Sequence, residues 1–267
     1  MSANMGSLDG RVAWITGGGS GIGRACAIAF ARAGAKVALT GRRITALEET
    51  ARLIGGQTGD VMIASADVSD GIAVKAAHKA IVTTLGDPLV LVNSAGGNVR
   101  ERHWANLAAA SAAELIDLDL KANFYCTLAV LPAMRAQHDG RIVHIASLAG
   151  VALTPVTGPS YSASKHGLVA MSASLNAEEG IHGIRSICIS PGEVDTPILN
   201  TRPVPLTAEE RALMLQPEDV ADVVVFCATL SPRACVAELI LLPTDSYHVR
   251  AQARSIEATV RTSTADA

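Results

Sequence analysis

The stretch Thr16-Gly17-Gly18-Gly19-Ser20-Gly21-Ile22-Gly23 follows a short apolar run, residues 11–16, and leads into an alanine-rich segment of helical period, residues 23–33. This order of strand, glycine-rich loop and helix is the context in which a dinucleotide is bound. Glycines let the backbone turn sharply and approach a pyrophosphate, whose negative charge meets the amides and dipole at the helix N-terminus. A glycine-rich tight turn without a ligand is the alternative, but the position after the first strand favours nucleotide binding.

The alternation of short apolar runs with longer helical segments continues along the chain. Strands are expected at residues 11–16, 36–40, 61–65, 89–93, 141–147, 185–190 and 238–242. The segments between them, such as residues 161–179, are long enough to be crossover helices, which requires a mostly parallel sheet. We therefore predict an α/β fold, a doubly wound Rossmann-type parallel sheet of about seven strands with helices on both faces.

The whole chain, residues 1–267, is expected to form this single domain. Residues 191–216 contain many Pro and Thr residues and no strand pattern, so we expect a mobile loop with one helix there, of which residues 197–216 would be a substrate lid. Residues 245–267 form a C-terminal extension with weak helical character and no assigned role.

Composition and charge exclude several classes of function. The net charge of −3, from 22 basic and 25 acidic side chains, gives no positive field that would gather nucleic acid or a membrane surface. Five widely spaced cysteines without a C-x-x-C pair indicate a reducing cytoplasm and predict no metal site. The first apolar run is too short for a signal peptide or a membrane span, so we expect a soluble, untargeted protein.

The residues after the second strand indicate which dinucleotide is used. A carboxylate there would bind a ribose 2′-hydroxyl, as NAD sites prefer, but this chain has Gly41-Arg42-Arg43. An arginine instead accommodates the 2′-phosphate, so NADP(H) is favoured and NAD(H) remains possible. Arg42 as a solvated helix-start residue is the alternative. Asp67-Val68, after the third strand, could contact adenine, or Asp67 could be an ordinary turn residue.

Taken in order, the motifs resemble those of the short-chain dehydrogenase/reductase family from about Asp9 to Thr244. The glycine loop resembles that family's T-G-x-x-x-G-x-G, and Tyr161-Ser162-Ala163-Ser164-Lys165 matches its Y-x-x-x-K. Asn93-Ser94-Ala95-Gly96 is similar to its N-N-A-G, and Pro191-Gly192-Glu193-Val194-Asp195-Thr196 to its P-G-x-V-x-T. Ser147 occupies the position of the catalytic serine. Ser94 stands where the family more often has Asn, and Ala146 where it more often has Ser. These departures change residues next to the reacting groups and not the reacting groups themselves.

The resemblance implies a set of cofactor contacts and an assembly. Val194 and Thr196 match the positions that hold the nicotinamide carboxamide, and Lys165 the one that bonds the cofactor ribose. The family also implies a homodimer or homotetramer. The predicted cofactor-binding residues are Gly17, Gly19, Ser20, Gly21, Ile22, Gly23, Arg42, Arg43, Asp67, Val68, Asn93, Ala95, Gly96, Tyr161, Lys165, Pro191, Gly192, Val194 and Thr196.

Hydride transfer to a ketone needs a proton for the developing alkoxide, and the reverse reaction needs an alcohol proton removed. The hydroxyl of Tyr161 can serve both directions as the general acid/base. Lys165 stands four residues later on the same helix face, where its positive charge favours the phenolate. Ser147 would hydrogen-bond and stabilise the substrate oxygen.

Asp119 is an unusual fourth candidate. It aligns with a position at which the family has an asparagine that completes a proton relay through water to the lysine, and Asn123 lies one helical turn further on. A carboxylate there can accept hydrogen bonds and would shift the coupled pKa values of the site. The alternative is a buried, hydrogen-bonded helix residue with no part in a relay.

Substrate specificity is expected from residues 97–104, 149–160 and 197–216. Arg100, Arg102, His103 and Arg202 could bind a carboxylate or the phosphates of a thioester, or could form a solvated charged loop. The favoured function is a carbonyl reductase or alcohol dehydrogenase acting on a small molecule. A 3-oxoacyl-thioester reductase and a catalytically idle NADP-binding protein are the alternatives.

Overall fold

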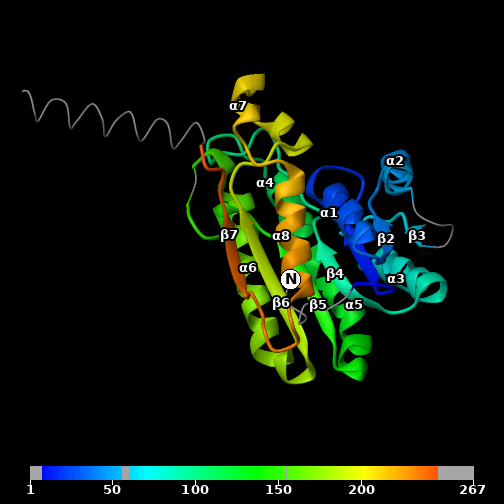
Figure 1. Cartoon of the computed structure of the whole chain (residues 1–267). Helices are drawn as coiled ribbons and strands as arrows, with labels where there is room; N and C mark the ends of the chain where they lie inside the picture. Colours follow the sequence, from blue (N-terminus) through cyan, green and yellow to red (C-terminus); the bar gives the residue numbers. More distant parts are fainter. Residues whose placement is uncertain (1–7, 56–59, 154, 246–267) are drawn as a thin grey trace, which may run out of the picture.

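The computed structural model describes residues 8–55, 60–153 and 155–245, and within them seven parallel strands form one sheet (Figure 1). The strand order is β3-β2-β1-β4-β5-β6-β7. The strands are β1 (Val12–Thr16), β2 (Lys36–Thr40), β3 (Val61–Ile63), β4 (Pro88–Asn93), β5 (Gly140–Ile145), β6 (Ile184–Pro191) and β7 (Glu238–Leu241). The predicted doubly wound fold is confirmed.

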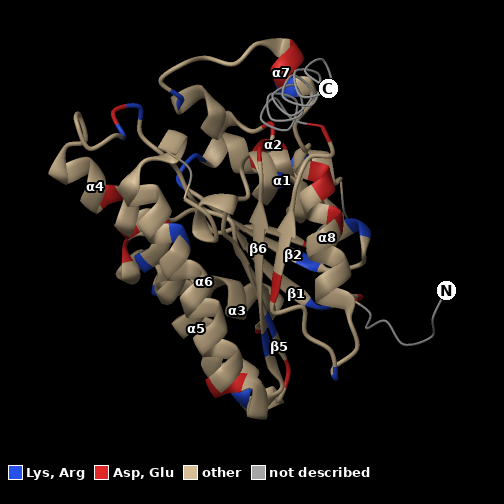
Figure 2. Cartoon of the chain, turned by 90° about the vertical axis from the view of Figure 1, so that its left-hand side faces the viewer, with Lys and Arg blue, Asp and Glu red and all other residues tan. Residues whose placement is uncertain are grey.

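Helices cover both faces of the sheet, and Figure 2 shows α5 and α6 on one side of the strands and α8 on the other. The first layer contains α1 (Gly21–Arg32), α2 (Ile44–Ile54) and α8 (Pro217–Thr229). The second contains α3 (Gly71–Leu85), α5 (Ala122–Gln137) and α6 (Pro159–Glu179). Shorter elements are α4 (Ala109–Ile116), α7 (Ala208–Ala212), a π-helical turn at Asp117–Lys121 and 3-10 helices at Leu148–Gly150, Pro155–Thr157, Gly180–His182 and Pro197–Thr201.

Successive residues of the central strands pack into opposite layers. In β1, Ala13 and Ile15 pack with α1 and α8, whereas Val12 and Trp14 pack with α3 and α5. A strand buried on both faces needs an unbroken apolar run, which is why these segments lack a polar alternation. None of the helices in the described part of the chain combines the length and apolarity needed to span a membrane.

The strand ends differ from the predicted ones by one or two residues. The largest difference for the site is in β5, which ends at Ile145 and not at residue 147. Ser147 instead caps the 3-10 helix Leu148–Gly150, because its Oγ accepts a hydrogen bond from the backbone N–H of Ala149 at 3.2 Å. The chain therefore turns at Ser147 and leaves the sheet.

The segment 191–216 is more ordered than expected. It contains the 3-10 helix Pro197–Thr201 and the short helix α7, and Val194 forms an isolated parallel bridge with Leu215. Of the predicted C-terminal extension, only Asp245 belongs to the described residues, and residues 246–267 lie outside them.

The strand order reverses between β1 and β4, and the loops that follow these two strands meet there. The backbone N–H groups of Ser94 and Ala95 donate to Oγ1 of Thr16, at 3.0 Å and 3.1 Å. In open α/β sheets the ligand lies at this reversal, beyond the carboxyl ends of the strands. The fold therefore places a binding crevice beside the glycine loop.

Close packing of the glycine loop on α1 generates the first prediction. A Cβ at Gly23 would lie 2.4 Å from the carbonyl oxygen of Gly17, so Gly23→Ala forces the loop backbone to move. We expect Gly23→Ala to lower the free energy of unfolding by about 1–3 kcal/mol. Urea unfolding measures this change. The matched control is Gly180→Ala, since Gly180 has φ −58° and no atom within 4 Å of its Cβ position, and it should leave stability unchanged or slightly higher. Equal losses in the two variants would contradict the packing argument.

Candidate active site

Two adjoining clefts follow the carboxyl ends of the strands. The first has a volume of about 270 Å³ and the second about 480 Å³. Both are lined by Gly17, Ser20, Arg43, Ala95 and Gly96, so they form one groove across the reversal of strand order.

Most of the predicted site residues line this groove. The first cleft contains Gly17, Gly19, Ser20, Arg42, Arg43, Asp67, Val68, Ala95 and Gly96. The second contains, besides the shared residues, Gly21, Ile22, Ser147, Tyr161, Lys165, Pro191, Gly192, Val194 and Thr196. The residues of the glycine loop and the two-arginine segment thus lie together at one end, and Ser147, Tyr161 and Lys165 at the other.

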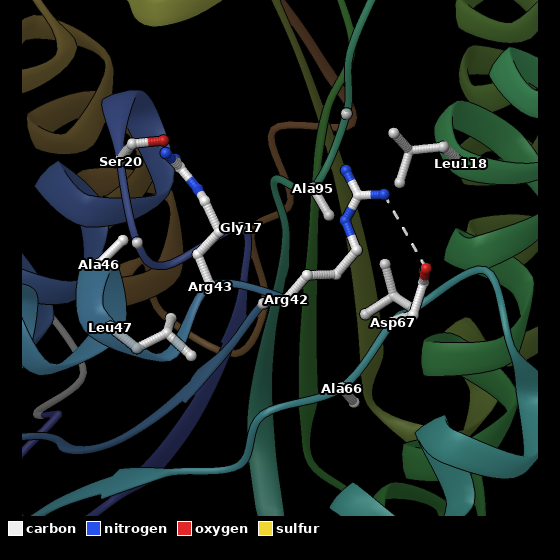
Figure 3. Close-up of a pocket in the computed structure, with 14 residues that line it drawn as sticks. Gly17, Ser20, Arg42, Arg43, Ala46, Leu47, Ala66, Asp67, Ala95 and Leu118 are labelled. Carbon is white, nitrogen blue, oxygen red and sulfur yellow. Dashed lines mark ion pairs between the residues drawn. The ribbon is translucent and has the colours of Figure 1, made fainter.

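Arg42 and Arg43 extend from the end of β2 into the first cleft (Figure 3). Arg42 points towards Asp67, with 4.0 Å between Nη1 and Oδ2, whereas Arg43 points towards Ser20. Hydrogen bonds from Ser69, helped by the charge of Arg42, hold the pKa of the Asp67 carboxyl below its usual value. The side chain of Arg42 is 68% exposed, so this long ion pair leaves it accessible to a phosphate.

Tyr161 and Lys165 lie in the first turns of α6, beside the end of β5. Lys165 is only 5% exposed, and its Nζ donates to the carbonyl of Ile145 at 3.1 Å and lies 5.4 Å from the centroid of the Tyr161 ring. Ser147 follows β5 and shares the cleft wall with both residues. The structure thus brings together, next to the groove, a phenolic hydroxyl, an ammonium group and a second hydroxyl.

Asp119 lies behind this wall in the π-helical turn and is completely buried. Its Oδ1 accepts a hydrogen bond from the N–H of Gly97 at 2.9 Å, and its Oδ2 has no hydrogen-bond partner among the described residues. Burial raises the pKa of Asp119 to about 6, although the positive charge of Lys165 and the N–H of Gly97 lower it. Asn123 does not approach the groove, because its Nδ2 donates to the backbone carbonyl of Asp119 at 3.0 Å.

Gly23 and Asn93 are the other predicted residues outside the groove walls. Gly23 supports the loop from inside α1. The Nδ2 of Asn93 is 3.4 Å from Oγ1 of Thr127 and 3.3 Å from Nδ1 of His144. Burial, together with the charge of Lys165, lowers the pKa of His144 to about 3, so its imidazole is neutral. Both predicted residues support the groove from beneath it.

Of the four basic residues proposed to bind an anionic substrate, only Arg102 and Arg202 line the second cleft. Arg202 forms an ion pair with Glu193 at 2.8 Å. Arg100 and His103 are exposed and lie outside the cleft walls, which fits the alternative of a solvated loop for these two.

Sequence reasoning missed several residues of the site. Thr16 was treated only as part of the glycine loop, whereas its hydroxyl joins the loops after β1 and β4. A threonine at the end of a strand before a glycine loop carries a signal that could have suggested this role. Ala46, Leu47 and Leu118 also line the first cleft, but apolar side chains in helices give no such signal. Asn98, Ile198 and Leu199 line the second cleft and lie in the segments 97–104 and 197–216 from which substrate specificity is expected.

The matching family model agrees with this geometry. A model described as short chain dehydrogenase matches residues 11–204, which include β1, the glycine loop, Ser147, Tyr161 and Lys165. The chain belongs to the short-chain dehydrogenase/reductase family. It is therefore an oxidoreductase of a family that binds a nicotinamide cofactor, and the glycine loop, its close contact with α1 and the accessible Arg42 fit such a dinucleotide.

Individual relatives extend this assignment over most of the chain. The (2S)-[(R)-hydroxy(phenyl)methyl]succinyl-CoA dehydrogenase subunit BbsD of Thauera aromatica is 33% identical over 231 residues, covering 83% of this chain and 90% of the relative. The glycine betaine reductase ATRR of Emericella nidulans is 31% identical over 252 residues, covering 90% of this chain but only 19% of that longer protein. A crystal structure of a metagenomic short-chain oxidoreductase in complex with NADP has a TM-score of 0.77 and 31% identity, covering 90% of this chain and 100% of the other.

No group of three or more His, Cys, Asp or Glu side chains in residues 8–55, 60–153 and 155–245 is arranged to hold a metal ion.

The buried carboxyl of Asp119 generates a prediction on stability and pH. The pKa of Asp119 is about 6 in the folded protein, above its ordinary value of 3.8, so an ionised Asp119 lowers the free energy of unfolding. This loss begins near pH 4 and reaches its full size above pH 6. Asp119→Asn removes this cost. We expect the variant to be more stable than the parent by on the order of 1–3 kcal/mol at pH 8 and by clearly less at pH 5. Urea unfolding at both pH values measures the difference, and a difference that does not change with pH would show that Asp119 titrates normally.

Proposed function

We propose that this oxidoreductase interconverts a ketone and a secondary alcohol, with NADP(H) as the preferred cofactor and Tyr161 as the general acid/base. The observation that carries the proposal is the common cleft wall of Ser147, Tyr161 and Lys165, which continues into the groove with the glycine loop. A hydroxyl that must give and take a proton needs a fixed positive charge nearby, and Lys165 supplies one within 5.4 Å of the Tyr161 ring.

The cofactor supplies or accepts the hydride, and the side chains handle the proton and the developing charge. In the direction of reduction, Tyr161 donates its hydroxyl proton to the carbonyl oxygen, and in oxidation it takes the proton back. The buried ammonium of Lys165 stabilises the phenolate that is left. Since Oγ of Ser147 already accepts from Ala149, its hydroxyl proton is directed to the substrate oxygen and stabilises the alkoxide.

The proposed cofactor contacts divide between the two clefts. The glycine loop holds the pyrophosphate at the N-terminus of α1, and Arg42, with Arg43, binds the 2′-phosphate. Asp67 and Val68 lie against the adenine, and Val194 and Thr196 hold the carboxamide. The preference for NADP(H) is supported by the metagenomic short-chain oxidoreductase, which is 31% identical and was crystallised with NADP. NAD(H) remains the second candidate cofactor.

We propose Asp119 as a positioning residue for Lys165, in place of the asparagine that the family resemblance suggests at this position. The positive charge of Lys165 lowers the pKa of the Asp119 carboxyl. The same carboxyl accepts a hydrogen bond from the N–H of Gly97, the residue next to the cleft residue Gly96. Through a water molecule the carboxyl could pass protons to and from the ammonium, in which case its titration near pH 6 enters the pH dependence of the reaction.

A small-molecule substrate and a homodimer or homotetramer follow from the family, and a cytoplasmic location fits the five cysteines, all unpaired. A 3-oxoacyl-thioester reductase is the second candidate function. It is favoured by the relative BbsD, whose name describes a dehydrogenase of a coenzyme A thioester.

The reaction is tested by following NADPH consumption with a panel of ketones and 3-oxoacyl thioesters. We expect turnover of ketones that falls at least about 100-fold in kcat/KM for Tyr161→Phe, because the proton donor is lost while the ring packing is kept. Thioesters turned over in preference to simple ketones would favour the second candidate. Tight NADPH binding without turnover of any substrate would instead indicate a catalytically idle NADP-binding protein.

The cofactor preference is tested by Arg42→Ala. Loss of the guanidinium that faces the 2′-phosphate should raise KM for NADPH about 10- to 100-fold and leave KM for NADH nearly unchanged. Arg32→Ala is the matched control, since Arg32 is an exposed arginine at the end of α1 outside both clefts. A parent enzyme with equal kcat/KM for the two cofactors would contradict the proposed preference.

A further inference from the structure

Arg102 is a buried cation in the wall of the second cleft, and it has no anionic partner among the described residues. It is 5% exposed, and its Nη2 donates to the backbone carbonyl and, at 3.0 Å, to the hydroxyl of Thr201. Its Nε has no hydrogen-bond partner in the described part of the chain. The other two buried arginines, Arg141 and Arg185, lie 2.9 Å and 3.8 Å from the carboxylate of Asp139. A guanidinium buried without a carboxylate is costly, which calls for an anion from outside the chain.

The backbone of Arg102 is held against the start of the helix that carries Tyr161. Gly158, the residue before α6, has φ +80°, and a Cβ there would lie 2.3 Å from the carbonyl oxygen of Arg102. Asn98 holds the same loop in place, since its Nδ2 donates to the carbonyl of Thr157 at 3.0 Å. This contact therefore fixes Arg102 relative to the proposed acid/base.

The electrostatics of the group agree with this placement. Burial, and next the positive charge of Arg202, lower the pKa of Arg102, whereas the negative charge of an ionised Tyr161 would raise it. Arg102 and Tyr161 are thus close enough to influence one another. An anion bound at Arg102 would lie near the reacting centre.

The charged side chains that line the second cleft are mostly positive. They are Arg43, Arg102, Lys165 and Arg202, against the single carboxylate of Glu193. Glu193 is paired with Arg202, Lys165 is bonded to the carbonyl of Ile145, and Arg43 extends into the first cleft. Arg102 is therefore the cation that remains for a substrate.

We infer that the substrate is an oxo acid or the corresponding hydroxy acid, and that Arg102 binds its carboxylate. The inference rests on the proposed function. The carbonyl carbon takes the hydride from NADPH, its oxygen takes the proton from Tyr161, and the carboxylate stays unchanged. A carboxylate close to the carbonyl fits better than the phosphates of a thioester carrier, because the guanidinium lines the same cleft as Tyr161 and its loop is packed against the start of the helix that carries Tyr161.

The test compares oxo acids with their methyl esters, which keep the carbon skeleton and lose the charge. Short 2-, 3- and 4-oxo acids and their esters are reduced with NADPH by the parent enzyme and by Arg102→Met. We expect at least one acid to exceed its ester about 10- to 100-fold in kcat/KM with the parent, mainly through KM. In Arg102→Met this ratio should fall to near one, because the methionine side chain carries no charge for the carboxylate.

Two further variants separate charge from position. Arg102→Lys keeps the positive charge, so it should retain part of the preference for the acid. Arg100→Met removes an arginine from the same loop, outside the cleft walls, where its Nη2 lies 3.5 Å from the carbonyl of Pro203. It should leave the ratio of acid to ester unchanged.

Several outcomes overturn the inference, and each has a distinct meaning. One overturning outcome is turnover of neutral ketones without a preference for any acid, and another is a preference for the acid that survives in Arg102→Met. Both are compatible with the proposed reaction, but both contradict a carboxylate site at Arg102. If Arg102→Met raises KM for NADPH and leaves the ratio of acid to ester kcat/KM unchanged, Arg102 binds the cofactor and not the substrate. If Arg102→Met fails to fold, Arg102→Lys takes its place, and an acid-to-ester ratio unchanged from that of the parent enzyme has the same overturning force. Absence of turnover with every ketone and acid would overturn the proposed function itself.

Discussion

The hydrogen bonds from the N–H groups of Ser94 and Ala95 to the hydroxyl of Thr16 are the interaction on which the site depends. They join the loops after β1 and β4, the two central strands from which the chain departs towards opposite sides of the sheet. Without this link, the glycine loop and the loop that leads to Arg102 could separate independently. The two clefts share Gly17 and Ala95 because the link holds both loops at one place, so the phosphate end and the reacting end form one groove.

Lys165, His144 and Asp119, which are buried beneath the groove, together carry one positive charge when Asp119 is protonated and no net charge when it is ionised. Lys165 is buried with a carbonyl for a partner, and the neutral imidazole of His144 adds no charge. Asp119 is the one group there whose charge changes near pH 6. In the proposed mechanism, protonation of Asp119 would strengthen the influence of Lys165 on Tyr161, since an ammonium stabilises a phenolate more strongly when no carboxylate competes. An asparagine at this position would keep that influence independent of pH, which is the physical meaning of the substitution.

The sequence predicted the parts of the molecule that follow from local pattern. All seven strands, the glycine loop and the four-residue spacing of Tyr161 and Lys165 arise from periodicity and from residues next to strand ends. The π-helical turn around Asp119 could not be predicted from local pattern, because the turn and α4 both pack against α6, which lies about 40 residues further along the chain. Arg102 and His103 are neighbours with similar sequence signals, yet one is buried and the other exposed. The contacts of Arg102 with Gly158 and Thr201 separate them, and both contacts join residues far apart in the chain.

Arg102 also connects recognition with the lid. Its Nη2 is bonded to Thr201 at the end of the 3-10 helix Pro197–Thr201, while its backbone rests on the start of α6. An anion at the guanidinium would neutralise the charge that burial makes costly, and so favour the arrangement in which loop, lid and α6 are packed together. A neutral ligand gives no such gain. Under the carboxylate inference, the same arginine would bind the substrate and stabilise the packing of the three segments around it, because a ligand favours an arrangement only by its differential affinity for that arrangement.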